Sequence, residues 1–252
     1  MPPAPSVCVI VPMYNEEAGA ERCVCTICPV LSDLPVKAAL AVVNDGSVDR
    51  TASLLASLAG RFDNLMVITH PRNAGYGAAL RTGIARAAQA GFTYALFMDS
   101  DLTNNPADIP AFVEKMLEGC DVIKATRYSR GGTVSGVPAW RVAISRAGNS
   151  IARRLYGLPV ADCTNGFRAV KLNVLRRMTL TESRFPIIME ELYYCKYLAR
   201  SYAEVPVTLT NRREGQRPTS FRYRPRVFYD YLKYPLRSFL RIRPAALARE
   251  AR

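Results

Sequence analysis

Residues 6–17 read SVCVIVPMYNEE, an apolar run that ends in polar and acidic side chains. The part up to Met13 is rich in Val and Ile and carries no charge, which is typical of a strand buried on both faces of a sheet. A helical pattern follows, from about Glu17 to Cys28. A buried strand followed by a helix is the repeating unit of an α/β fold.

The same alternation continues along the chain. We expect further strands over residues 36–43, 65–69, 94–98 and 121–125. The helices expected between them end near Leu58, span residues 78–90, and run from Pro106 to about Leu117. The sequence therefore predicts an α/β fold with a mostly parallel central sheet flanked by helices on both faces.

Polar residues gather where three of the expected strands end: Tyr14–Glu16, Asn44–Asp45 and Asp99–Asp101. In an open α/β sheet, ligands bind beyond the carboxyl ends of the strands. Acidic side chains on one rim repel phosphate unless a divalent cation bridges them. Mg²⁺ and Mn²⁺ bind carboxylate oxygens and share their coordination with substrate phosphates. The pattern thus indicates a cation-assisted phosphate site.

Other common sites are excluded by what the motifs lack. A dinucleotide-binding site needs glycines in the first strand-to-helix turn, but residues 12–17 read PMYNEE. Gly75 and Gly77 form only a fragment of such a motif, and no phosphate-binding loop with a lysine is present. The single histidine, His70, has no G-x-S-x-G nucleophile motif to serve.

Four ordered motifs carry a resemblance to a known family: VIVPMYNEE (9–17), VVNDGSVD (42–49), RNAGYGAALRTG (72–83) and FMDSDLTNNP (97–106). They are similar to those of glycosyltransferase family 2, enzymes of the GT-A fold that use nucleotide-sugar donors. In the second half, further segments resemble the branch of dolichyl-phosphate mannose synthases and other polyprenyl-phosphate glycosyltransferases: ATRYSRGG (125–132), Trp140-Arg141, DCTNGFR (162–168) and EVPVTLTNRREG (204–215). The resemblance covers residues 6 to 217.

The resemblance implies a donor site at the strand ends. Four residues would hold the nucleoside: Pro12, Tyr14, Glu16 and Asp45. Asp99 and Asp101 would hold the donor diphosphate through Mg²⁺ or Mn²⁺, and Arg212 would close on that diphosphate. The implied donor is GDP-mannose or a UDP-sugar.

The resemblance also implies a polyprenyl phosphate as the acceptor. Arg127, Arg141 and Ser145 match positions that grip the lipid phosphate, and Glu190 matches a carboxylate on the acceptor side. The residues expected to carry the reaction are Asp99, Asp101, Arg127 and Arg141. An acceptor phosphate is already an anion at neutral pH, so the transfer of mannose or glucose needs no general base. Attack from the face opposite the leaving group would invert the anomeric centre.

Two other functions remain open. The same donor site could serve a soluble acceptor, in which case Arg141 and Ser145 would be dispensable and Glu190 would act as a base. The chain could also be a non-catalytic module on a membrane surface, although four carboxylates that repel one another have little reason to persist without a cation. Structural roles also remain open for several positions: Asp45 as a turn residue, Asp49 as a helix cap, Tyr14 in the core, Arg127 and Arg141 as solvated charges, and Glu190 on a helix surface.

Three positions depart from the family pattern. Tyr76 stands where many members carry Lys in N-x-G-K-G, and Thr103–Asn105 replaces a more usual Gln-His after Asp101. The family's Ser-Lys is replaced by residues 216–220, QRPTS, with Arg217 as the candidate for the missing lysine. We expect this last segment to form a lid over the donor.

The net charge of +13 over 252 residues is concentrated at the C-terminal end. From Arg212 to Arg252 there are 12 Lys and Arg against 3 acidic residues, which leaves only +4 for the rest. Val227, Phe228, Tyr231 and Leu232 follow a helical spacing, which we expect Pro235 to interrupt. Such a segment can lie in a membrane interface, pack on the domain as a helix, or bind nucleic acid.

Of these, we favour the membrane interface and expect no nucleic-acid partner. The expected organisation is a GT-A catalytic domain over residues 1–217 and a basic amphipathic tail over 218–252. No apolar stretch approaches the roughly 18 residues of a membrane-spanning helix, so we expect a peripheral protein on the cytoplasmic face. A membrane-anchoring partner is compatible with this expectation. Cys23, Cys25 and Cys28 lack a second ligand pair at zinc-site spacing and are read as buried apolar residues.

Overall fold

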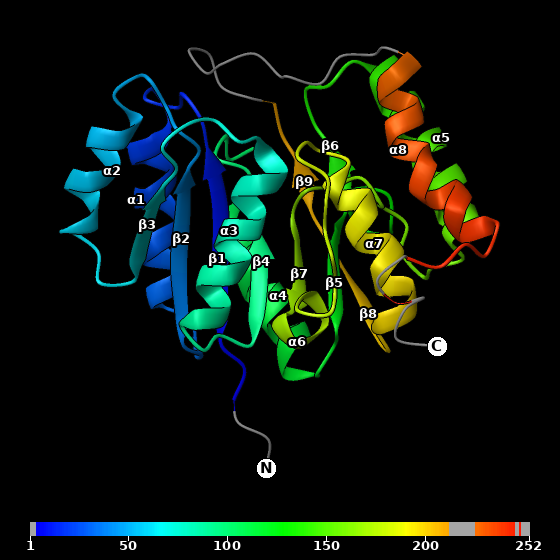
Figure 1. Ribbon diagram of the computed structural model, residues 1–252, viewed down its shortest axis with the longest axis horizontal. Coiled ribbons are helices and arrows are strands. Elements are labelled where there is room, and N and C mark those ends of the chain that lie inside the picture. Colours follow the sequence, from blue (N-terminus) through cyan, green and yellow to red (C-terminus); the bar gives the residue numbers. More distant parts are fainter. Residues whose placement is uncertain (1–3, 212–224, 245–246, 248–252) are drawn as a thin grey trace.

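A seven-stranded sheet with the strand order β3-β2-β1-β4-β7-β5-β8 runs through the protein (Figure 1). The structure is a computed structural model that describes residues 4–211, 225–244 and 247. The strands of the sheet are β1 (Val7–Met13), β2 (Ala38–Asn44), β3 (Leu65–Thr69), β4 (Tyr94–Phe97), β5 (Val122–Thr126), β7 (Arg168–Lys171) and β8 (Tyr202–Pro206). β7 runs antiparallel to β4 and β5, and every other pairing within the sheet is parallel.

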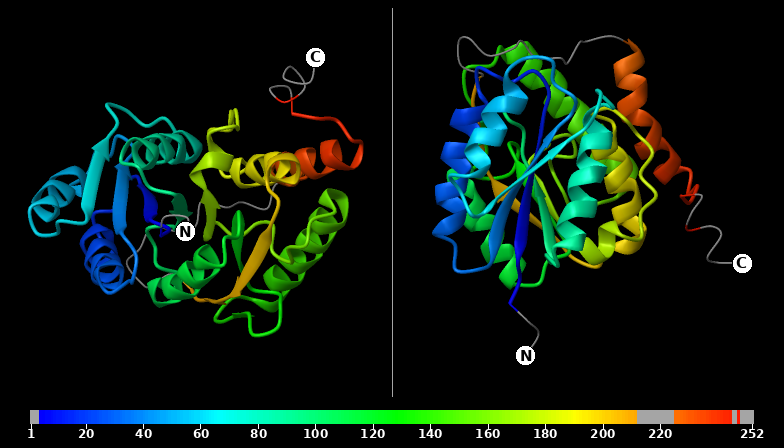
Figure 2. Two further views of the ribbon diagram at one scale, coloured as in Figure 1. Left: turned by 90° about the horizontal axis from the view of Figure 1, so that it is seen from below. Right: turned by 60° about the vertical axis from the view of Figure 1, so that its left-hand side comes forward.

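Helices cover both faces of the sheet, as the sequence predicts (Figure 2). One face is covered by α1 (Ala20–Ser32), α2 (Thr51–Ala59) and α4 (Ile109–Leu117), the last preceded by the 3₁₀ turn η1 (Pro106–Asp108). The other face is covered by α3 (Tyr76–Gln89), α6 (Leu172–Leu175) and α7 (Ile187–Leu198). Two further helices, α5 (Ala139–Tyr156) and α8 (Pro225–Phe239), lie side by side at the end of the sheet farthest from β3 (Figure 1).

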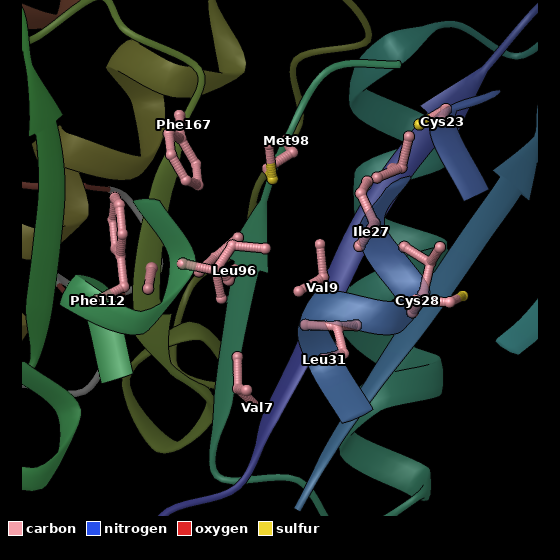
Figure 3. Packing of buried hydrophobic residues seen from close by; sticks show 14 of the residues in the cluster. Val7, Val9, Cys23, Ile27, Cys28, Leu31, Leu96, Met98, Phe112 and Phe167 are labelled. Atoms are coloured by element: carbon pink, nitrogen blue, oxygen red, sulfur yellow. The ribbon is translucent and has the colours of Figure 1, made fainter. Parts of the chain in front are cut away.

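The alternation along β1 explains why its sequence carries no polar residue. Val7 and Val9 point to one face, where they pack with Ile27 of α1 (Figure 3), whereas Cys8 and Ile10 pack on the opposite face. Both sets are fully buried, and burial of one such side chain contributes about 1.5–3 kcal/mol. The strand is therefore the centre of both core layers.

The cysteine cluster belongs to this core. Cys23 and Cys28 of α1 are fully buried, and Cys25 is half-buried. Burial raises the pKa of the Cys28 thiol to about 12, so the thiol stays neutral. Within the described residues there is no group of three or more His, Cys, Asp or Glu that could hold a metal ion. These thiols serve packing.

The α/β fold is confirmed, and β7 is a strand that the sequence pattern does not reveal. β7 reads RAVK and inserts antiparallel between β4 and β5, with Ala169 paired to both Leu96 and Ile123. Its four residues carry a cation at each end, so it lacks the apolar run by which the other strands are recognised. A small second sheet pairs β6 (Thr133–Val134) with β9 (Thr208–Leu209).

The prediction that Pro235 interrupts the C-terminal helix is wrong. α8 runs through Pro235 and ends only at Phe239. A proline inside a helix removes one backbone donor, and here Pro235 is buried together with Tyr234, whose ring centroid lies 5.7 Å from that of Tyr193 on α7. Packing of α8 on the domain offsets the missing hydrogen bond.

Candidate active site

A cavity of about 810 Å³ opens beyond the carboxyl ends of β4 and β5 and extends between α5 and α8. Five residues singled out from the sequence line it together: Asp99, Asp101, Arg127, Arg141 and Ser145. They come from three separate segments, because β4 leads into the two aspartates, β5 leads into Arg127, and α5 carries the other two. The fold thus joins the residues expected at the donor diphosphate to those expected at the acceptor phosphate.

The two aspartates are held by neighbouring hydroxyl groups. Asp101 accepts hydrogen bonds at Oδ1 from the backbone N–H and the hydroxyl of Thr103, at 3.0 and 2.9 Å. Asp99 accepts one from the hydroxyl of Tyr76 at 3.2 Å. Burial and the charge of Asp99 raise the pKa of Tyr76 well above its ordinary value of 10, which keeps this hydroxyl protonated as a donor. Tyr76 and Thr103, which belong to two of the three departures from the family pattern, therefore hold the two carboxylates in place.

Arg127 is paired with a buried carboxylate. Its Nε and Nη2 donate to the two oxygens of Asp162 at 2.6 and 2.9 Å, and Nη2 also donates to Thr164 at 3.0 Å. Burial opposes the charge of Arg127, but the carboxylate of Asp162 outweighs it and raises the pKa of the guanidinium. Arg127 is thus oriented by the fold, and its reading as a solvated surface charge is excluded.

α5 presents Arg141 and Ser145, one helical turn apart, to the cavity. The hydroxyl of Tyr128 donates to Ser145 Oγ at 2.7 Å. Asn149, one turn further along, accepts from the backbone N–H of Cys163 at 2.7 Å and donates to Thr164 at 3.0 Å. Thr164 also accepts the hydrogen bond from Arg127. The segment that contains Asp162 and Thr164 therefore fixes both α5 and Arg127.

The residues expected at the nucleoside lie at the neighbouring strand ends, outside the lining of the cavity. Pro12 is the penultimate residue of β1, and Tyr14 and Glu16 follow the strand; the Glu16 backbone N–H donates to Thr51 at 2.9 Å. Asp45, which follows β2, accepts backbone hydrogen bonds from Ala74 and Gly75 at 2.9 and 2.8 Å. His70 Nδ1 lies 2.7 Å from the same carboxylate. Asp45 therefore shapes the turn before α3 as well as standing at the sheet edge.

Glu190 does not reach the cavity. Its carboxylate, only 3% exposed as a residue, accepts from the backbone N–H groups of Thr181 and Glu182, each at 2.9 Å, and from the Thr181 hydroxyl at 2.7 Å. The structure gives it a clear role in holding residues 181–182, and its acceptor-side role stays a prediction. Arg212 and the lid segment with Arg217 lie outside the described residues.

The far end of the cavity is apolar. α5 contributes Val142, Ile144, Ala147, Gly148, Ile151 and Ala152, and α8 contributes Val227, Phe228, Tyr231 and Leu232. The sequence places Tyr231 in an amphipathic helix, by its helical spacing from Val227 and Phe228, but does not predict it as a site residue. Burial, with a further contribution from Asp99, raises the pKa of Tyr231. The C-terminal helix therefore forms one wall of the site.

The mostly parallel sheet, with the aspartates and arginines gathered beyond its strand ends, has the GT-A fold. The chain belongs to the family described as Glycosyl transferase family 2, whose model matches residues 8–179. It is accordingly a glycosyltransferase, as the motifs predict.

The chain is similar to two relatives whose names refer to polyprenol or dolichol. It is 30% identical over 226 residues to the polyprenol monophosphomannose synthase of Mycolicibacterium smegmatis, covering 84% of this chain and 80% of that protein. It is 30% identical over 232 residues to the dolichol-phosphate mannosyltransferase of Pyrococcus furiosus, covering 90% of this chain and 62% of that protein.

Solved structures support the fold. Glucosyl-3-phosphoglycerate synthase of Mycobacterium tuberculosis, in complex with Mn²⁺, uridine diphosphate and glucosyl-3-phosphoglycerate, superposes with a TM-score of 0.65 at 23% identity. That match covers 96% of this chain and 82% of the other. The same enzyme with Mg²⁺ and uridine diphosphate gives a TM-score of 0.62 at 24% identity, covering 85% of this chain and 73% of the other.

Proposed function

We propose that this glycosyltransferase moves a hexose, mannose or glucose, from a nucleotide-diphosphate sugar to a polyprenyl phosphate, with inversion at the anomeric carbon. One observation carries the proposal: a single cavity joins the Asp99 and Asp101 carboxylates, the Arg127 and Arg141 guanidinium groups and an apolar channel between α5 and α8. A soluble acceptor has no use for such a channel. The names of the relatives support the same acceptor class.

The two aspartates suit a divalent cation. Within the described part of the chain, no group of three or more possible ligands stands ready to enclose a metal alone. Mg²⁺ and Mn²⁺ are commonly held by one or two carboxylates together with substrate phosphates and water. Asp99 and Asp101 would supply the carboxylates. When bound, the cation would supply positive charge to the departing nucleoside diphosphate. The solved neighbours described with Mn²⁺ or Mg²⁺ and uridine diphosphate are consistent with this cofactor.

The protein's own part in the reaction is to align two anions that repel each other. Arg127, fixed by Asp162 and Thr164 through Nε and Nη2, would contact the acceptor phosphate through Nη1, and Arg141 on α5 would contact it as well, because a guanidinium stays charged and donates to phosphate oxygens. The Ser145 hydroxyl would add a third contact. With the phosphate oxygen held opposite the leaving group, attack needs no proton transfer, and inversion follows.

We further propose that the enzyme works as a peripheral protein on the cytoplasmic face of a membrane. In the described residues, no helix has both the length and the apolar content to cross a bilayer. On α5 and α8, the two helices that line the apolar end of the cavity, several large apolar side chains are more than a third exposed: Trp140, Ile144 and Ile151 of α5, and Phe228, Leu236 and Phe239 of α8. Together with the basic C-terminal segment, they suit an anionic bilayer surface.

The test is a release assay with the full chain, Mn²⁺ and each candidate donor, GDP-mannose or UDP-glucose. Release of nucleoside diphosphate should require a short polyprenyl phosphate, and the product should be a β-linked lipid-phosphate hexose. Release driven equally well by a soluble phosphate ester would favour the soluble-acceptor alternative. Release that ignores both acceptors would overturn the proposal.

A further inference from the structure

The carboxylate of Asp99 is confined on both sides. Its Oδ1 accepts the hydroxyl of Tyr76 from α3 at 3.2 Å. On the other side, a Cβ at Gly166 would lie 3.2 Å from Asp99 Oδ2 and 3.5 Å from the Tyr76 hydroxyl oxygen. Three segments that are distant in the sequence therefore meet at one carboxylate. A carboxylate after a strand end would otherwise choose among several rotamers, and confinement removes that freedom before any ligand binds.

The Tyr76 ring is itself held in place. It lies against the ring of Phe185, with 4.6 Å between the centroids. The first turns of α3 are fastened to the same segment, since Gly77 N–H donates to the Ser183 carbonyl at 2.9 Å and Arg81 donates to the Glu182 carbonyl at 2.6 Å. The approach is so close that a Cβ at Gly77 would lie 2.1 Å from the Glu182 carbonyl oxygen. Residues 181–186 thus form a backing surface for Tyr76, which we call the support segment.

The support segment is anchored at its N-terminal end by two helices. Glu190 of α7 binds the backbone of Thr181 and Glu182 from within the core. From α8, the hydroxyl of Tyr234 donates to Glu182 Oε1 at 2.8 Å, and Lys233 donates to the same oxygen. The support segment therefore links α8, which contacts Glu182, to Tyr76, which packs on Phe185 and donates to Asp99. The buried Glu190, which has no role in the cavity lining, holds the first two residues of this segment.

We propose that Tyr76 is a positioning residue for the Asp99 carboxylate: its hydroxyl fixes the carboxylate in the orientation that receives the donor-bound cation, and the support segment fixes Tyr76. This inference rests on the proposed function, because it assigns Asp99 to the cation. Hydrogen-bond partners of metal-binding side chains commonly change metal affinity by about tenfold or more when they are removed. The effect should appear in cation-dependent donor binding even when no acceptor is present.

The variant to make is Tyr76→Phe, which removes the hydroxyl and keeps the ring on Phe185. The matched control is Tyr94→Phe on β4, whose hydroxyl donates to the Cys120 carbonyl at 2.8 Å, away from the cavity. Binding of GDP and of UDP is measured by calorimetry over a series of Mn²⁺ concentrations. We expect Tyr76→Phe to raise the Mn²⁺ concentration needed for half-maximal nucleotide binding about tenfold, and Tyr94→Phe to leave it unchanged.

A second variant, Phe185→Leu, keeps the hydroxyl and loosens the ring, and we expect a smaller shift in the same direction. If nucleotide binding by the unsubstituted chain depends on Mn²⁺ and Tyr76→Phe needs the same Mn²⁺ concentration, the role of Tyr76 is overturned. The proposed function is then unaffected. Nucleotide binding by the unsubstituted chain that does not depend on Mn²⁺ would overturn both this inference and the proposed cation. Equal shifts in Tyr76→Phe and Tyr94→Phe would also count against it, because the effect would then be general loosening of the fold.

Discussion

Arg127 and Asp162, 35 residues apart in the sequence, form a two-point ion pair at the edge of the cavity, with N–O distances of 2.6 and 2.9 Å. Asp162 is fully buried, and its Oδ1 also accepts the backbone N–H of Asn165 at 3.1 Å. The pair turns a flexible cation into one with a fixed direction. It also joins the segment after β5 to the segment before β7, so the site and the fold share one interaction.

We expect Asp162→Asn to lower the free energy of unfolding by about 3 kcal/mol, because the variant leaves Arg127 buried beside a neutral amide. Burial would raise the pKa of Asp162, but Arg127 outweighs this and holds it below the ordinary value of 3.8. A carboxyl with a lowered folded-state pKa stabilises the fold fully above its unfolded value, and this stabilisation is lost as the pH falls through the folded value. The difference between the unsubstituted chain and the variant should therefore be constant near neutral pH and shrink below about pH 4. Urea unfolding at several pH values measures it, and a difference that does not change with pH would contradict the assignment.

Asp101→Asn should abolish transfer while the fold stays intact. The substitution keeps an oxygen for Thr103 but removes one of two negative charges at the proposed cation position. Losing the alignment and charge neutralisation of the leaving group costs at least about a hundredfold in turnover. The release assay measures turnover, and circular dichroism checks the fold. Asp63→Asn, at an exposed position, is the control, and near-normal turnover by Asp101→Asn would mean that the cation does not bind there.

Arg141→Ala should weaken the acceptor reaction without affecting the donor. A charged hydrogen bond to phosphate contributes about 1.5–3 kcal/mol, so kcat/KM for the polyprenyl phosphate should fall about ten- to a hundredfold. Nucleotide binding should remain unchanged. Arg154→Ala, on an exposed part of the same helix, is the matched control. If both variants behave alike, general charge on α5 rather than a specific contact holds the acceptor.

Gly148→Leu should separate stability from lipid binding. A Cβ at Gly148 meets nothing within 4 Å, and the residue lines the apolar end of the cavity in the middle of α5. Replacing a glycine inside a helix favours the fold by about 0.5–1 kcal/mol, whereas a leucine would fill part of the channel. We expect an unchanged or higher melting temperature together with a raised KM for long polyprenyl phosphates. Gly148→Ala adds only a methyl group and should retain the original KM, and an unaltered KM in Gly148→Leu would mean that the lipid lies elsewhere.

Vesicle binding should divide into an apolar and an electrostatic part. Phe239→Ser with Leu240→Ser removes two side chains that are 63% and 65% exposed and should weaken binding to anionic vesicles at every salt concentration. Arg241→Gln with Arg243→Gln should weaken it mainly at low salt, because charge attraction is screened over about 10 Å at 0.1 M. Point substitutions are preferable to deleting α8, since Tyr234 completes the core around Tyr193. If co-sedimentation with vesicles is unchanged in both double variants, the end of α8 does not bind the membrane.

The sequence by itself determined the layered α/β fold and the place of the site. A strand that is buried on both faces must be apolar throughout, so β1, β2 and β4 could be recognised locally, and the end of each strand located Asp45, Asp99 and Asp101. The motifs then predicted the family, which the family model confirms. β7 could not be predicted, because its four residues include two cations and are buried only by pairing with β4 and β5.

Only the tertiary structure decided which side chains act together. Arg127 pairs with Asp162, and the hydroxyl of Tyr76 donates to Asp99. Glu190 lies outside the cavity and binds the support segment. The tertiary structure also makes α8 a wall of the site, since Tyr231 lines the same cavity as Asp99. Periodicity along a chain records whether a residue is buried. The partner that a buried polar group finds depends on how distant segments approach one another, and that approach is set by the packing of the whole fold.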